Sequence, residues 1–286
     1  MGDARHEMRQ TRAFWDSSPC GTLGDVEKRL AFLFRMEPWT RDFMQKVARD
    51  HPHIVEIGCG QGTHACHLCR QLPAGGSYLG LDYSPASVEI ARATLGDGAA
   101  GGVVPRFRVG DAESLPIADS SVPFIYSIGV LHHTADDRKA FREVERVLRP
   151  GGRAVIGLYR HPSLKIGVAK LMRGIQKGLD LLLRTDRCIY RFLKGRHFPD
   201  ALGSMLLEGF GVPFLRAYWR SELPGLFPGL RLVGSQAVGY NLPHWNPKGS
   251  GKTPFGYLWI LELEKPSAPA ERRQAGNPVA SQKVVA

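Results

Sequence analysis

The sequence predicts an α/β fold built around an open, mostly parallel sheet, and three observations support this prediction. Short apolar segments typical of buried strands alternate with longer segments of helical periodicity. A glycine-rich turn, 58–62, follows the first of these strands, 53–57, and opens a helical segment. An acidic residue, Asp82, ends the second strand, 22 residues after Gly60 (82 − 60). Repeated strand–turn–helix units of this kind form parallel sheets.

The glycine-rich turn indicates a nucleotide-like ligand. Gly58, Gly60 and Gly62 stand at alternate positions, where glycine allows a positive φ and a close approach of the ligand to the backbone. The helix that follows, to about residue 71, offers unpaired N–H groups and a positive dipole end. The third glycine comes one residue too early for the dinucleotide pattern G-x-G-x-x-G, which disfavours an NAD-dependent oxidoreductase.

Two helices precede the first strand, and the remaining elements follow it in alternation. Helical spacing of apolar residues predicts the first two helices over about 25–34 and 39–49. Ser84 and Pro85 are suited to open the helix after the second strand. Pro150, Gly151 and Gly152 predict a tight turn between a helix over 138–148 and the fifth strand. Strands are predicted over 53–57, 77–82, 105–109, 122–128, up to 159, 230–240 and 255–264.

This ordered set of motifs resembles the class I S-adenosylmethionine (SAM) methyltransferases, and within them the small-molecule branch that includes ubiquinone and menaquinone methyltransferases. The resemblance rests on the glycine-rich turn, on Asp82, on the pair Asp111-Ala112, and on the segment 128–133 after the fourth strand. It covers residues 54–159 well and the last two strands more loosely. It implies a Rossmann-like seven-stranded sheet with an antiparallel last strand, SAM as the cofactor and S-adenosylhomocysteine as the product.

The resemblance also implies a role for each motif. The glycine-rich turn passes under the methionine part of SAM, Asp82 holds the ribose, and Asp111-Ala112 borders the adenine. Residues after the fourth strand line the cleft where the acceptor enters. The predicted cofactor-binding residues are Trp15, Glu56, Gly58, Cys59, Gly60, Gly62, Thr63, Asp82, Tyr83, Ser84, Asp111, Ala112, Glu113, Ile128 and Gly129.

His132 and His133 are the predicted catalytic residues. Methyl transfer requires mainly alignment of the reacting groups, and a base helps only when the nucleophile has a proton to lose. An unperturbed imidazole titrates near pH ~6.5 and is suited to take a proton from a phenol or hydroxyl. The pair therefore favours O-methylation over C- or N-methylation. The alternative is that one or both histidines hydrogen-bond the backbone and shape the loop.

The cysteines and histidines near the glycine-rich turn do not predict a metal site. His64 and His67 point about 200° away from Cys66 and Cys69 on a helix, so that one ion cannot bind all four. The five cysteines lack disulfide-scaffold spacing, no apolar run reaches the ~20 residues of a membrane span, and the N-terminus lacks a signal peptide. A cytoplasmic location is therefore expected.

The chain is expected to contain additions to the minimal fold. The aromatic pair Phe14-Trp15 opens a segment that either folds over the cofactor as a lid or anchors itself to the core. The expected divisions are an N-terminal lid with helices (1–50), a SAM-binding core (51–160), a helical cap insertion between strands five and six (161–212), the remaining core strands (213–265) and a disordered tail (266–286).

The insertion is strongly basic and amphipathic. Between residues 160 and 200 the sequence contains ten Lys and Arg residues and three acidic residues. This stretch therefore contributes +7 to the chain's formal charge of +11. Apolar residues at helical spacing suggest a helix with Lys and Arg on its other face. Such a helix could close over the substrate, extend the core, or contact an anionic membrane peripherally through 160–200. The apolar positions are Leu164, Val168, Leu171, Ile175 and Leu179.

The predicted function is transfer of a methyl group from SAM to a small organic acceptor, in the biosynthesis of a secondary metabolite or a quinone-like, lipophilic compound. The alternatives are a non-catalytic SAM-binding subunit and an RNA-directed methyltransferase that uses the basic insertion. Nucleic acid is a disfavoured partner, because 127–130 lacks the Asp/Asn-Pro-Pro-Tyr pattern and no cysteine lies between Cys69 and Cys188. The sequence leaves the acceptor and the oligomeric state open.

Overall fold

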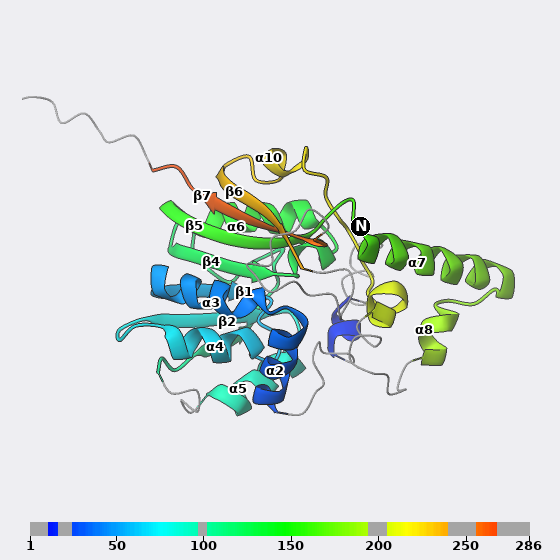
Figure 1. Ribbon diagram of the computed structural model, residues 1–286, viewed down its shortest axis with the longest axis horizontal. Coiled ribbons are helices and arrows are strands. Elements are labelled where there is room, and N and C mark those ends of the chain that lie inside the picture. Colours follow the sequence, from blue (N-terminus) through cyan, green and yellow to red (C-terminus); the bar gives the residue numbers. More distant parts are fainter. Residues whose placement is uncertain (1–10, 17–24, 97–101, 194–204, 240–255, 268–286) are drawn as a thin grey trace, which may run out of the picture.

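The protein has a seven-stranded sheet with helices on both faces (Figure 1). In this computed structural model the strand order is β3-β2-β1-β4-β5-β7-β6. Strands β1 to β5 are parallel, and β7 is antiparallel to both of its neighbours. The predicted fold class and its antiparallel last strand are therefore confirmed. The described residues are 11–16, 25–96, 102–193, 205–239 and 256–267.

The strand bounds follow the sequence prediction closely. Three of the predicted strands, β1, β2 and β4, have the predicted bounds. The strands are β1 (His53–Ile57), β2 (Ser77–Asp82), β3 (Arg106–Val109), β4 (Val122–Ile128), β5 (Leu148–Tyr159), β6 (Arg231–Val238) and β7 (Leu258–Glu264).

Strand β5 begins earlier than predicted. The turn expected at Pro150-Gly151-Gly152 lies inside the strand, because Leu148 already pairs with Val122 of β4. The N–H of Gly151 also donates to the carbonyl of Lys265, 2.9 Å away, beyond the end of β7. These partners are distant in sequence, so local turn chemistry alone predicted the wrong boundary.

Two apolar clusters, one on each face of the sheet, form the core. One contains α2 (Val26–Met36), α3 (Trp39–Asp50), α4 (Thr63–Gln71) and α5 (Pro85–Leu95). The other contains α6 (Asp137–Val147) and the short α10 (Leu223–Leu226). Successive strand residues alternate between the clusters: Phe124 and Tyr126 of β4 belong to the first and Ile125 to the second.

Between β5 and β6 the chain forms the predicted helical insertion. It contains α7 (Leu164–Leu183), α8 (Cys188–Leu193) and the turn η2 (Leu207–Gly211). Ser163 caps α7 by accepting the N–H of Ile166. Figure 1 shows α7 projecting away from the sheet, with α8 near its far end.

The side of α7 that packs on the protein differs from the apolar stripe seen in the sequence. Its buried residues are Ile166, Ala169 and Gln176. Leu171 and Ile175 of the apolar stripe are instead exposed. The apolar stripe is therefore not the side by which α7 packs, although Ile166 of the same helix belongs to the core.

The remaining chain adds two observations. Residues 11–16 are helical and lie against the end of the sheet where the chain leaves β2. Within the described ranges, no helix combines the length and apolar character needed to cross a membrane. The predicted disordered tail lies outside the described residues apart from its first two positions, 266 and 267.

Candidate functional site

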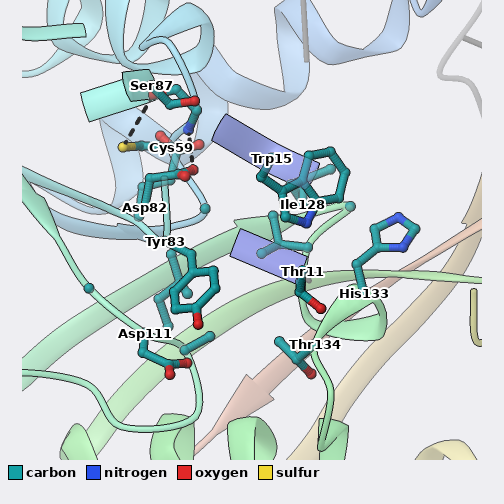
Figure 2. Close-up of a pocket in the computed structure, with 18 of the residues that line it drawn as sticks. Thr11, Trp15, Cys59, Asp82, Tyr83, Ser87, Asp111, Ile128, His133 and Thr134 are labelled. Atoms are coloured by element: carbon teal, nitrogen blue, oxygen red, sulfur yellow. Dashed lines mark hydrogen bonds between the residues drawn. The ribbon is translucent and has the colours of Figure 1, made fainter. Parts of the chain in front are cut away.

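A cavity of about 290 Å³ lies at the carboxyl ends of β1, β2, β3 and β4. Its wall includes Ile57 and Ile128, the last residues of β1 and β4, which neighbour each other in the sheet. The chain reverses its direction of winding between these two strands, and ligands of open α/β sheets bind at such a switch point. In Figure 2, Asp82, Tyr83 and Asp111 line one side of this cavity, and Trp15 and His133 the other.

The glycine-rich turn forms the floor of the cavity for stereochemical reasons. Gly58, Gly60 and Gly62 all have positive φ values, of 80°, 52° and 79°. A Cβ atom on Gly58 would come within 2.2 Å of Val130, so that this position has no room for a side chain. A Cβ atom on Gly60 would meet no protein atom within 4 Å, which leaves its backbone open to a ligand. Gly62 fixes the start of α4 and does not line the cavity.

The buried guanidinium of Arg29, on α2, holds the turn from behind. Its terminal nitrogen donates to the carbonyl of Gln61 at 3.2 Å, and its Nε donates to the Thr63 hydroxyl at 3.3 Å. Because Arg29 is only 4% exposed, these contacts are shielded from water and constrain the turn strongly. The sequence analysis missed Arg29, since only the tertiary fold brings α2 to the turn.

Asp82 joins the turn to the second strand. Its two carboxylate oxygens accept the N–H groups of Gly60, at 2.7 Å, and Ser84, at 2.9 Å. Burial raises the pKa of Asp82 above its usual range, while these two N–H donors oppose the shift. The carboxylate lines the cavity and keeps lone pairs for further donors such as ribose hydroxyls.

Ser84 lies behind this wall of the cavity. Its hydroxyl accepts the N–H of Ser87, which caps α5, and donates to Asp16 at 2.6 Å. Ser84 therefore ties the N-terminal helix 11–16 to the end of β2 and does not line the cavity. Arg12 strengthens this contact by stacking 4.7 Å above the ring of Tyr83.

The predicted adenine side is built from a compact turn after β3. Asp111 and Ala112 line the cavity, and Asp111 accepts the N–H of Glu113 at 2.8 Å. Glu113 in turn accepts the N–H of Asp136 at 2.9 Å and so connects this turn to the start of α6. Burial raises the pKa of Glu113.

Two further lining residues have buried, constrained side chains. Glu56 is 2% exposed, accepts the hydroxyl of Tyr78, and lies 3.5 Å from Nδ1 of His64. Burial raises the pKa of the Cys59 thiol well above its ordinary value. The thiol is therefore protonated near neutral pH and is not suited to act as a nucleophile.

His133 is the predicted catalytic residue that reaches the cavity. Its Nδ1 lies 2.7 Å from the carbonyl oxygen of Phe214, and since a carbonyl only accepts, Nδ1 carries the hydrogen. Nε2 is then the unprotonated nitrogen and can accept a hydrogen bond. Burial lowers the pKa of His133 to about 4, below the ~6.5 of an unperturbed imidazole.

His132 is placed differently. It is completely buried, is absent from the cavity wall, and packs on Tyr159 with ring centroids 4.0 Å apart. Among the described residues neither of its ring nitrogens has a hydrogen-bond partner, and burial lowers its pKa well below the ordinary value. The geometry gives His132 no contact with a ligand in the cavity.

The structure thus brings most of the predicted site residues together. Those absent from the cavity wall are Gly62, Ser84 and His132. Those on the wall are Trp15, Glu56, Gly58, Cys59, Gly60, Thr63, Asp82, Tyr83, Asp111, Ala112, Glu113, Ile128, Gly129 and His133.

Some residues of the wall were not predicted. Thr134 and Ala135 directly follow the predicted segment 128–133, so the continuation of that loop was a signal for them. Thr11 and Ser87 carry no such signal, because their positions depend on the packing of two helices. Searched across the described ranges, the structure holds no cluster of three or more His, Cys, Asp or Glu residues that could bind a metal.

Comparison with known proteins identifies this arrangement. The profile of a family described as "Methyltransferase domain" matches residues 55–156, which contain the glycine-rich turn, Asp82, Asp111 and His133. Residues 55–156 thus match a methyltransferase domain, which supports the class I SAM-dependent methyltransferase that the motifs predict. The match agrees with SAM as the cofactor that the sequence motifs predict.

Two curated relatives are named as methyltransferases. An O-methyltransferase of Penicillium expansum is 38% identical over 104 residues, which is 36% of this chain and 37% of that protein. The demethylmenaquinone methyltransferase of Lactococcus lactis is 35% identical over 154 residues, 52% of this chain and 60% of that protein. Both matches support a small-molecule methyltransferase, which is the class that the motifs indicated.

The similarity has a limited extent. The chain spans 37% to 64% of the length of the curated relatives considered. The similarity of fold covers more of the chain than the similarity of sequence. The structure of magnesium protoporphyrin IX methyltransferase from Synechocystis, which contains S-adenosylhomocysteine, aligns with 89% of this chain and 97% of its own chain. Its TM-score is 0.54 and its identity 17%. At that identity the likeness concerns the fold alone.

Proposed function

We propose that the protein transfers a methyl group from SAM to a hydroxyl or phenol group of a small organic acceptor. The proposal rests on one observation, that two different sets of groups line the same cavity. One side has the open glycine backbone and the Asp82 carboxylate, and the other has Nε2 of His133 held as an acceptor.

The cofactor side fits SAM by its chemistry. The backbone at Gly60 and Gly129 leaves room for a ligand, because a Cβ atom at either position would meet no protein atom within 4 Å. Asp82 would accept the ribose hydroxyls, and Asp111 would accept the adenine amino group. Trp15 covers the cavity from the N-terminal helix and would exclude water. Bound SAM supplies a methyl group already activated by its sulfonium.

The role proposed for His133 is orientation of the acceptor. With Nδ1 committed to the Phe214 carbonyl, Nε2 can accept the hydrogen of an acceptor hydroxyl and direct its oxygen into the cavity. A pKa of about 4 makes the imidazole a weak base, so alignment contributes more than proton removal. O-methylation remains favoured over C-methylation, since a carbon acceptor has no comparable use for this nitrogen.

The proposal is tested by incubating the protein with methyl-labelled SAM and a panel of phenols, hydroxy acids, quinols and amines. Label should appear on hydroxylated acceptors, together with stoichiometric S-adenosylhomocysteine. Label on carbon or amine acceptors alone would contradict the O-methylation proposal. Tight S-adenosylhomocysteine binding without turnover on any acceptor would support the alternative of a non-catalytic SAM-binding subunit.

A further inference from the structure

The most unusual surface of the protein is the solvent-facing side of α7. Leu171, Ile175 and Leu182 are 65%, 51% and 77% exposed. At 100° per residue these three side chains fall within about 40° of one another, so they form one continuous stripe along the helix. Leu164, Leu179, Leu181 and Leu183 extend the exposed apolar surface along the helix and at its end.

We define the stripe as Leu164, Leu171, Ile175, Leu179 and Leu182. It is not the side by which the helix packs on the core. The opposite side of α7 already packs on the protein through Ile166 and Ala169. Arg173 reinforces that side by donating to the carbonyls of Val212 and Pro213, at 2.6 and 2.8 Å. The helix therefore has a docked side and a separate apolar side, and contiguous exposed apolar patches mark interaction sites.

Basic residues lie on the other side of α7 and on α8. Residues 164–193 include seven Lys and Arg residues and two Asp residues, so their formal charge is +5 (7 − 2). Lys177, Arg184 and Arg191 lie on the exposed surface. Asp180 is occupied in accepting the N–H groups of Arg187 and Cys188, both at 2.8 Å, which fixes the start of α8.

We propose that α7 and α8 form a docking surface for an anionic phospholipid bilayer, with the stripe inserted among the acyl chains and the basic residues at the headgroups. An amphipathic helix with leucines on one side and Lys or Arg on its polar side lies in the membrane interface in this way. No described helix is both long and apolar enough to cross the bilayer, so the proposed contact is peripheral.

The positive charge of this segment favours an anionic bilayer over the two other possible partners, a second copy of the chain and a nucleic acid. A second copy docked stripe to stripe would oppose the same +5 segment to itself, and such like-charge contacts are unfavourable. A nucleic acid would use the basic residues but would leave five exposed apolar side chains without a role. An anionic bilayer uses both the charge and the apolar area.

The surface is also connected to the cavity. Tyr190 of α8 packs against Phe14 at 5.8 Å between ring centroids, Phe14 packs against Trp15 at 4.9 Å, and Trp15 packs against His133 at 5.8 Å. The proposed membrane contact thus lies next to the helix that covers the site. The proposal does not depend on methyl transfer, because it rests on the surface alone.

The test is sedimentation of the full chain with vesicles of phosphatidylcholine mixed with phosphatidylglycerol, and with vesicles of phosphatidylcholine alone. The protein should bind the anionic vesicles at low salt, more weakly at high salt, and the neutral vesicles least. Replacing Leu171, Ile175 and Leu182 together by Gln should weaken vesicle binding by at least about tenfold. Replacing Lys177, Arg184 and Arg191 together by Gln should weaken it by about a hundredfold, at about fivefold per residue.

Matched controls separate the surface from general effects. Val104→Gln with Val233→Gln removes apolar residues that are 54% and 48% exposed elsewhere, and Lys28→Gln with Lys46→Gln removes basic side chains that are 74% and 63% exposed. Both controls should bind vesicles like the wild type, and every variant should keep its S-adenosylhomocysteine affinity as a measure of folding. Three results would overturn the proposal: no binding to anionic vesicles, binding that the α7 variants leave unchanged, or a stripe that forms a dimer in sedimentation without binding vesicles.

Discussion

At the scale of single residues, the two adjacent histidines after β4 have different environments although they are identical in sequence. His133 lines the cavity with its tautomer set by the carbonyl of Phe214, whereas His132 is buried on Tyr159. The sequence predicted that the pair lies near the acceptor, and of the two only His133 lines the cavity. It could not distinguish the two, because Phe214 lies 81 residues away and reaches the loop only in the folded protein.

This difference predicts separate effects of substitution. His133→Ala should lower kcat by about a hundredfold, within the range for a lost positioning and proton-accepting group, and leave S-adenosylhomocysteine affinity within about threefold. His132→Phe should keep most activity, since it preserves an aromatic ring against Tyr159. Steady-state kinetics and calorimetry check both. An equal loss of kcat in the two variants would contradict the role assigned to Nε2 of His133. The control is His53→Ala, a substitution at an exposed position.

At the scale of elements, the N-terminal helix 11–16 is held over the cavity by polar and aromatic contacts. Asp16 accepts the hydroxyl of Ser84, and Arg12 lies over Tyr83. The residues that the helix presents to the cavity are Thr11 and Trp15. This supports the lid interpretation proposed from the Phe14-Trp15 pair, while Phe14 is buried and supports the anchoring interpretation as well.

If the helix 11–16 acts as a lid, weakening its attachment should speed the release of a ligand from the cavity. Asp16→Ala removes a hydrogen bond to a carboxylate, worth about 1.5 kcal/mol or more, and should accelerate S-adenosylhomocysteine release by about tenfold. Stopped-flow fluorescence, using Trp15 as the reporter, measures the rate. Asp50→Ala, on the exposed end of α3, should leave it unchanged. A release rate for Asp16→Ala equal to that of the wild type would mean that the helix does not gate the site.

The elements also show where sequence reasoning succeeds. Strand β1, the glycine-rich turn and Asp82 were predictable because local stereochemistry and short-range order determine them: a positive φ requires glycine, and an acid at the end of β2 faces the turn. Helix α7 was predictable as a helix but not in its orientation. Its apolar spacing suggested a buried side, whereas Arg173 and Gln176 make the docked contacts through hydrogen bonds to carbonyls.

At the scale of the whole molecule, the buried histidines predict a dependence of stability on pH. Burial lowers the pKa of His133 and of His51 to about 4, against ~6.5 in the unfolded chain. Between these values the unfolded chain binds more protons than the folded protein, so the free energy of unfolding falls as the pH drops from 6.5 to 4. For His133 the loss is at most about 3 kcal/mol.

Urea unfolding across this pH range checks the prediction by comparing the wild type with His133→Phe. The buried acids Asp82, Glu113 and Glu37 have raised pKa values and oppose the trend, so the difference between the two proteins isolates His133. The variant should lose stability less steeply on acidification. Identical slopes would show that His133 titrates normally in the folded protein.

The central claim is that the cavity between the glycine-rich turn and His133 binds SAM through Asp82. Calorimetric titration of S-adenosylhomocysteine into the wild type, Asp82→Asn and the exposed control Asp186→Asn tests it most directly. Binding with a Kd on the order of micromolar is expected for the wild type and the control, with a loss of about a hundredfold in Asp82→Asn, because charge-assisted bonds to two ribose hydroxyls are removed. A folded wild type that binds no S-adenosylhomocysteine, or an Asp82→Asn variant that binds it equally well, would contradict the account.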